Sequence, residues 1–205
     1  MAQHLRNVSL RRFESDYFIA QTMTAATQWL ELNYSQHKNF FLHIDAFDPH
    51  EPWDPPKYYV NMYDPNYEGE EVTYPVYGPC KYLSEEELKH TKALYAAEVT
   101  MVDRWIGTLL EKIEDLGLLE DTVVIFTSDH GFYFGEHGFI GKSIISPGVV
   151  GWAPLYEEVS RVPLLIQLPD SVPHVHGVRS EALVQSPDLM PTILEMAGAN
   201  FPKGV

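Results

Sequence analysis

One short segment of this chain brings together four side chains that can do chemistry. A carboxylate, two imidazoles and an ammonium group lie within fourteen residues, in the run Asp129-His130-Gly131, Gly135-Glu136-His137-Gly138 and Gly141-Lys142. An Asp oxygen beside a His nitrogen can bind a divalent cation, and a lysine nearby can hold an anionic group. We therefore predict a metal site at Asp129 and His130 and an anion-holding role for Lys142.

Each of these assignments has a plainer alternative. An Asp-His-Gly sequence after a strand is often only a turn, in which the Asp side chain bonds to its own backbone. A lysine is most often a solvated surface residue, and Glu136 can point away from a site that its neighbours form. The clustering of these residues after a strand favours the functional interpretation, because ligands in open α/β folds bind beyond the carboxyl ends of strands.

The other histidines are candidates of unequal weight. His50 follows an apolar stretch and lies among prolines. We predict that it acts as a general acid or as a hydrogen-bond donor to a substrate, the alternative being a loop histidine packed on an aromatic ring. His137 either faces the substrate or braces the glycine loop. His43 is expected to be structural, and the pair His174 and His176 is expected to lie in a loop without a metal.

The hydrophobic pattern predicts an α/β fold in which helices flank a mostly parallel sheet. Apolar runs typical of buried strands occur at residues 39–47, 122–127, 162–168 and 182–185. Amphipathic helices are expected at residues 15–32, 84–116 and 187–197. Ser84 and Glu87 have the spacing of a capping box at the start of the long helix, and Gly117 is placed to end it. The aromatic and proline-rich stretch at 54–82 is expected to be a long loop.

The composition disfavours several classes of function. The 205 residues include 14 basic and 29 acidic side chains, and the net charge of −15 argues against nucleic-acid binding through a basic face. No apolar run is long enough to predict a membrane-spanning helix. Cys80 is the only cysteine, which excludes an internal disulfide and a multi-cysteine zinc site. The sequence specifies neither the compartment nor the oligomeric state.

Five segments of the chain form a recognisable pattern. They are residues 40–56, 95–107, 122–142, 160–166 and 186–194. The first contains Asp48-Pro49-His50-Glu51-Pro52-Trp53, and the third contains the Asp-His-Gly and Gly-Lys sequences. Together, and in this order, the five segments resemble the sulfatase family, within the alkaline-phosphatase-like superfamily. The resemblance extends over residues 40–198.

The resemblance implies a sulfuric ester hydrolase that depends on a divalent metal. In the family this metal is usually calcium, with magnesium or manganese as alternatives, and it activates a formylglycine hydrate that attacks the sulfur of a sulfate ester. Carried over to this sequence, Asp129 and His130 bind the metal. Lys142 contacts the sulfate oxygens, His50 contacts the substrate or its leaving group, and His137 is a further substrate-binding candidate. The metal and the lysine would stabilise charge on the ester oxygens.

The sequence also departs from the family pattern. The Cys/Ser-x-Pro-x-Arg segment that supplies the nucleophile has no counterpart, because Cys80 lacks both the proline and the arginine at the required spacing. The family's N-terminal strand with paired aspartates and its small C-terminal subdomain have no counterpart either. We therefore expect residues 1–205 to be a single incomplete catalytic domain, inactive alone, with the formylglycine nucleophile in a missing N-terminal part.

Two other interpretations stay open. One is a phosphonate or phosphodiester hydrolase of the same superfamily, which shares the Asp-His-Gly and Gly-Lys patterns. The other is a non-catalytic remnant that acts as a binding module. The upstream coding sequence discriminates between them, because a Cys-x-Pro-x-Arg segment there would favour an enzyme and unrelated sequence would favour a remnant. The identity of the sulfate ester cannot be derived from these residues.

Overall fold

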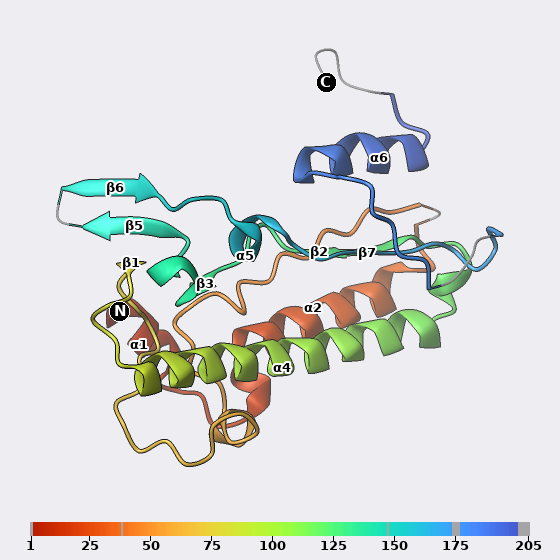
Figure 1. Ribbon diagram of the computed structural model, residues 1–205. Coiled ribbons are helices and arrows are strands. Elements are labelled where there is room, and N and C mark those ends of the chain that lie inside the picture. Colours follow the sequence, from red (N-terminus) through yellow and green to blue (C-terminus); the bar gives the residue numbers. More distant parts are fainter. Residues whose placement is uncertain (1, 38, 147, 174–176, 201–205) are drawn as a thin grey trace.

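A computed structural model describes the chain except for residues 1, 38, 147, 174–176 and 201–205. Its two long helices, α2 (Phe18–Asn33) and α4 (Glu85–Asp115), pack side by side. A two-stranded sheet of β2 (Val124–Thr127) and β7 (Leu164–Gln167) lies between this helix pair and α6 (Leu189–Met196) (Figure 1). The predicted α/β class, with helices flanking a sheet, is confirmed.

The remaining elements are short. They are α1 (Ala2–Val8), η1 (Glu14–Asp16), α3 (Lys57–Val60), β1 (Gly78–Pro79), η2 (Leu118–Glu120), β3 (Tyr133–Phe134), η3 (Glu136–Gly138), β4 (Phe139–Gly141), β5 (Ser143–Ser146), β6 (Val149–Trp152), α5 (Glu157–Ser160) and η4 (Ser186–Asp188). Apart from α3 and β1, the stretch 54–82 contains turns and irregular backbone, as predicted. No helix in the described ranges is long and apolar enough to cross a bilayer.

The direction of strand pairing differs from the prediction of a mostly parallel sheet. β2 and β7 pair antiparallel, with Phe126 opposite Leu165. The sheet β1-β4-β3 and the β5-β6 hairpin are antiparallel as well. Parallel pairing needs separate strands linked by crossovers. The two segments predicted to provide further strands, residues 39–47 and 182–185, join no sheet in the described part of the chain.

Residues 39–47 nevertheless have the side-chain pattern of a strand. The segment is irregular by hydrogen bonding, but its side chains alternate between two environments. One set packs on the main core: Phe40, Leu42, Ile44 and Ala46. The alternate set faces outward, with Phe41 71% exposed. This period of two is that of a half-buried strand without hydrogen-bonded neighbours.

The helix pair supplies most of the core. Met23, Leu30, Leu94 and Met101 are among its buried residues. Ser84 Oγ accepts a hydrogen bond from the backbone N–H of Glu87 at 3.2 Å, and the Glu87 carboxylate accepts from the backbone of Ser84 at 2.7 Å. Gly117 has a φ of 69° directly after the helix end. The predicted capping box and glycine terminator are therefore both confirmed.

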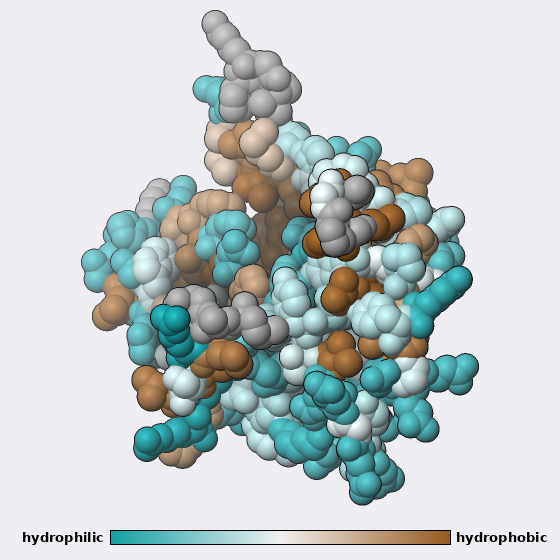
Figure 2. Space-filling view, turned by 90° about the vertical axis from the view of Figure 1, so that its left-hand side faces the viewer, coloured by the Kyte–Doolittle hydropathy of each residue, from teal (hydrophilic) through white to brown (hydrophobic). Residues whose placement is uncertain are grey.

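The sheet formed by β2 and β7 is incompletely covered. Leu165 is 61% exposed, Ile166 is 44% exposed, and no residue of α6 is buried. Figure 2 shows brown, hydrophobic surface gathered in a recess below the C-terminal helix. The short segment 182–185, predicted to be a strand, is exposed. That prediction is wrong, because none of its side chains is packed well enough to favour a strand.

Candidate functional site

Lys142 lies between two of the histidines that the sequence singled out. Its Nζ atom is 2.8 Å from Nε2 of His50 and 3.1 Å from Nε2 of His130. All three side chains are partly exposed. The structure thus brings together three of the five predicted site residues at one place, from segments on either side of the long helix α4.

The position of Lys142 is fixed by the small sheet that precedes it. β4 pairs with β1 on one side and with β3 on the other, and it ends at Gly141. Gly141 has a φ of 102°, and a Cβ atom there would lie 2.7 Å from the ring of Tyr77. Only glycine allows the chain to turn here without strain and to pass this close to an aromatic ring.

His50 is held by a loop that is anchored on a buried tryptophan. Trp53 is fully buried, and its Nε1–H donates to the carbonyl of Pro49 at 2.9 Å. The backbone N–H of Trp53 donates to the carbonyl of Thr73, also at 2.9 Å. The backbone N–H of His50 donates to the carbonyl of Phe47 at 3.0 Å. These bonds fix the loop on both sides of the imidazole.

His130 is held by contacts between its own turn and α5. The backbone N–H of Gly131 donates to the carbonyl of Val159 at 2.8 Å. A Cβ atom on Gly131 would lie 2.0 Å from the carbonyl oxygen of Glu158, so only glycine fits. Part of the turn alternative is also present, because Asp129 Oδ1 accepts from the backbone N–H of His130 at 2.8 Å.

The hydrogen bonds specify the same tautomer for both imidazoles. Nδ1 of His130 is 2.9 Å from the carbonyl oxygen of Gly131, and Nδ1 of His50 is 2.8 Å from the carbonyl oxygen of Glu51. A carbonyl oxygen only accepts and the Lys142 ammonium only donates, so each Nδ1 carries a proton and each Nε2 presents a lone pair. Both lone pairs are therefore available to Lys142 or to a metal.

Asp129 and His130 present two acceptor atoms close together. Oδ2 of Asp129 is 3.3 Å from Nε2 of His130, and the Asp129 side chain is 82% exposed. Two acceptors this close do not bond each other, and their spacing suits neighbouring ligands of one divalent cation with bonds of about 2.3 Å. No group of three or more His, Cys, Asp or Glu side chains in the described part of the chain has metal-binding geometry. The pair can supply only part of a metal shell.

Glu51 is a residue of this site that the sequence did not point out. Its side chain is 2% exposed, and its Oε2 atom is 3.4 Å from Nδ1 of His50. Burial raises the pKa of the Glu51 carboxyl, while the positive charge of Lys142 nearby acts to lower it. The sequence signal that could have pointed to Glu51 is its place between His50 and Pro52, in a segment rich in proline and aromatic residues.

His137 and Glu136 brace the glycine loop. The His137 ring stacks on Tyr156 with centroids 3.9 Å apart, and its Nε2 is 3.3 Å from Oε2 of Glu158. Glu136 accepts from the backbone N–H of Phe134 at 2.6 Å and pairs with Lys92 at 3.0 Å. These contacts support the alternative that His137 holds the glycine loop in place. A contact between His137 and the substrate stays a prediction.

His43 is the remaining histidine candidate that the structure describes. His43 is on the exposed side of the segment 39–47, away from the main core. His174 and His176 lie outside the described residues. Neither observation bears on the site around Lys142.

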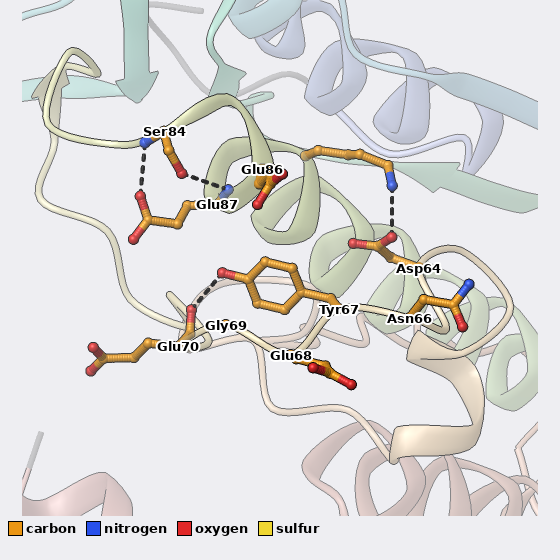
Figure 3. A pocket seen from close by; sticks show the side chains of 10 residues that line it. Asp64, Asn66, Tyr67, Glu68, Gly69, Glu70, Ser84, Glu86 and Glu87 are labelled. Atoms are coloured by element: carbon orange, nitrogen blue, oxygen red, sulfur yellow. Dashed lines mark hydrogen bonds and ion pairs between the residues drawn. The ribbon is translucent and has the colours of Figure 1, made fainter.

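A cavity at the start of α4 lies away from these residues and is unsuited to an anion. It has a volume of about 610 Å³ at the start of α4 and is lined by carboxylates around Tyr67, from Asp64, Glu68, Glu70, Glu86 and Glu87 (Figure 3). Its one cation, Lys89, is paired with Asp64 at 2.7 Å. This field repels negative charge. We therefore place the candidate site at Lys142.

Comparisons with known proteins agree with the resemblance seen in the sequence. A family model described as Sulfatase matches residues 4–199. An arylsulfatase of Clostridium perfringens is 31% identical over an alignment 186 residues long, which covers 82% of this chain and 36% of that protein. The chain thus spans about a third of the length of this relative.

Two solved structures share the fold. A structure described as a complex with its substrate D-glucosamine-2-N,6-O-disulfate superimposes with a TM-score of 0.69 at 23% identity, covering 92% of this chain and 50% of that one. A phosphonate monoester hydrolase from Silicibacter pomeroyi superimposes with a TM-score of 0.64 at 24% identity, covering 95% and 40% of the two chains.

Proposed function

Because the chain belongs to the sulfatase family, we propose that residues 1–205 are part of the catalytic domain of a sulfuric ester hydrolase. The observation that carries this proposal is the position of Lys142 between the Nε2 atoms of His50 and His130. A primary ammonium group that donates to two imidazole acceptors is held in place and keeps a third N–H for an oxygen of a tetrahedral anion. A chain whose net charge is −15 needs such a local positive charge in order to bind an anionic substrate.

Lys142 and His50 have distinct roles in this proposal. Lys142 donates to the sulfate oxygens and stabilises the charge that they carry as the ester bond breaks. His50 lies beside it with Nδ1 fixed by the Glu51 carbonyl, so that Nε2 is the atom that faces the leaving oxygen. Nε2 takes up a proton from water and gives that proton to the leaving oxygen as the ester bond breaks. His137 supports the loop that carries Lys142 through its contacts with Tyr156 and Glu158.

Asp129 and His130 are the proposed metal ligands. The donor set fits a hard divalent cation, because one carboxylate oxygen and one imidazole lone pair lie 3.3 Å apart at an exposed edge. Calcium is the proposed ion, with magnesium or manganese as alternatives. When bound, it would stabilise negative charge on the sulfate oxygens. Further ligands and the formylglycine nucleophile are proposed to come from residues beyond these 205.

The proposed substrate is a sulfate monoester of a ring alcohol. The similar structure with a sulfated glucosamine and the aryl sulfatase relative support this class. The second candidate is a phosphonate monoester, supported by the similarity to a phosphonate monoester hydrolase. The donor atoms around Lys142 fit either tetrahedral anion. The relative affinity of the chain for a sulfate and for a phosphonate therefore distinguishes the two candidates.

Binding of phenyl sulfate, followed by nuclear magnetic resonance, tests the proposal on the chain itself. We expect Lys142→Ala to weaken binding by roughly 10-fold or more, since it removes a charge-assisted hydrogen bond. Lys81→Ala removes an exposed lysine elsewhere and is the matched control. Phenyl methylphosphonate has the same charge and a similar shape, and tighter binding of this compound would favour the second candidate. Equal affinity of wild type and Lys142→Ala for both compounds would remove the basis of the proposal.

A further inference from the structure

A cavity of about 310 Å³ lies beside His50. It is lined by aromatic, imidazole and carboxyl side chains from three parts of the chain, namely His4, Phe47, His50, Glu51, Pro52 and Tyr74. This volume is near the lower limit for small-molecule sites, so it suits one ring better than an extended ligand.

We propose that this cavity binds the alcohol part of the substrate as a single hydroxyl-bearing ring, while Lys142 holds the sulfate group. This inference rests on the proposed function and adds the residues that select the alcohol. His50 connects the two parts, because its imidazole lines the cavity and its Nε2 atom is 2.8 Å from Nζ of Lys142. An ester held at Lys142 therefore has its ring within reach of the cavity.

Two aromatic side chains provide flat apolar surface for such a ring. Phe47 is 58% exposed and Tyr74 is 50% exposed, so part of each ring is open to a ligand. The Phe47 ring lies 4.5 Å from the ring of His50 at an interplanar angle of 30°. Exposed aromatic rings beside a proton-transfer group are suited to stacking against the apolar face of a ring.

Glu51 provides a polar group that can distinguish a hydroxylated ring from an apolar one. Its Oε1 atom is buried and has no hydrogen-bond partner among the described residues. A buried acceptor without a donor costs free energy, and a ligand hydroxyl can supply the missing bond. This carboxyl group favours hydroxyl donors and disfavours a further anionic group on the ring.

Three sulfate esters that carry the same charge separate the contributions of the ring and of its hydroxyl groups to binding. The probes are methyl sulfate without a ring, cyclohexylmethyl sulfate with an apolar ring, and glucose 6-sulfate with a hydroxylated ring. Dissociation constants for the purified chain come from nuclear magnetic resonance titrations. We expect glucose 6-sulfate to bind on the order of 10-fold more tightly than cyclohexylmethyl sulfate, the effect of one hydrogen bond to a charged acceptor.

Variants assign these preferences to residues. Phe47→Ala and Tyr74→Ala should each weaken both ring sulfates several-fold and leave methyl sulfate unchanged. Phe41→Ala, an exposed phenylalanine outside the cavity, is the matched control. Glu51→Gln should reduce the preference for glucose 6-sulfate over cyclohexylmethyl sulfate, and circular dichroism reports whether it folds.

The outcomes separate the inference from the proposed function. If Lys142→Ala weakens all three sulfates while Phe47→Ala and Tyr74→Ala behave like Phe41→Ala, the ring site is refuted and the sulfate site stands. Equal binding of the two ring sulfates by wild type would refute the role of Glu51. If no sulfate binds, or if Lys142→Ala changes none of them, both proposals fall together.

Discussion

The Nζ atom of Lys142 lies 2.8 Å from Nε2 of His50, although 92 residues separate them in the sequence. The bond joins the loop after the extended segment 39–47 to the end of the small sheet β1-β4-β3. Because the lysine also reaches His130 at 3.1 Å, its charge bears directly on the ligand atom proposed for the metal. This shared contact has consequences that can be measured.

Lys142 and a divalent cation compete for Nε2 of His130. We predict that Lys142→Ala raises calcium affinity by about 10-fold, because it removes a positive charge and a hydrogen-bond donor close to the ligand atom. Asp129→Ala should abolish binding, since it removes one of two proposed ligands. Isothermal titration calorimetry measures both, with Asp103→Ala as an exposed control on α4. A loss of calcium affinity in Lys142→Ala would contradict the competition.

The chain alone should bind an aryl sulfate without hydrolysing it. Covalent catalysis needs an activated nucleophile, and no Cys or Ser in this sequence lies in a Cys/Ser-x-Pro-x-Arg segment. The absorbance of nitrophenolate released from 4-nitrophenyl sulfate, with calcium present, should therefore not rise above the uncatalysed rate. Turnover by the purified chain that disappears in Lys142→Ala would show that a nucleophile had been overlooked.

Glu98 makes the stability depend on pH. Its side chain is 2% exposed, and burial together with the charges of Asp48 and Asp54 raises its pKa from 4.5 to about 9, against the effect of Arg11. Between these two pH values the folded protein keeps a proton that the unfolded chain releases. Stability therefore falls as the pH rises, by roughly 3 kcal/mol between pH 4.5 and pH 7 at most.

Substitution of Glu98 by glutamine removes this dependence. Glu98→Gln should be more stable than wild type near neutral pH, by a margin that grows from about pH 5 to about pH 8. Urea unfolding at several pH values measures it, and Glu111→Gln on the exposed side of α4 is the control. A margin that is constant over this pH range would mean that Glu98 is ionised throughout.

Two glycine-to-alanine substitutions should change the free energy of unfolding in opposite directions. Gly141→Ala places a Cβ atom 2.7 Å from the Tyr77 ring at a φ of 102°. We expect it to lower the free energy of unfolding by about 2 kcal/mol and to weaken sulfate binding by displacing Lys142. Gly107→Ala lies in α4, where a Cβ atom meets nothing within 4 Å. It should stabilise the protein by about 0.5–1 kcal/mol and leave sulfate binding unchanged, as denaturant unfolding and titration can show.

Local signals in the sequence were sufficient for the helices and for two strands. The capping box at Ser84, the αL glycine at Gly117 and the apolar runs in β2 and β7 act over a few residues, and the structure has all of them. The direction of strand pairing was not predictable in this way. An apolar run favours a strand, but the direction in which that strand pairs depends on which other strands lie beside it.

The candidate site was predictable in part for a similar reason. His50, His130 and Lys142 follow apolar runs or glycine turns, so their convergence could be anticipated from chain direction alone. Glu51 could not be, because its burial depends on the Trp53 anchor and on the cavity formed with His4 and Tyr74. The burial of a side chain by three segments that are distant in the sequence cannot be inferred from the residues next to it.

The bond between Lys142 and His50 also couples ligand binding to the folding of the whole chain. It closes a loop of 92 residues whose ends become ordered together. An anion that bridges these two side chains binds only the closed form, so it must raise the melting temperature of the protein as its concentration exceeds the dissociation constant. A thermal shift on adding sulfate would then report the assembly of this distant pair, and compounds could be ranked by heating the protein without any catalytic turnover.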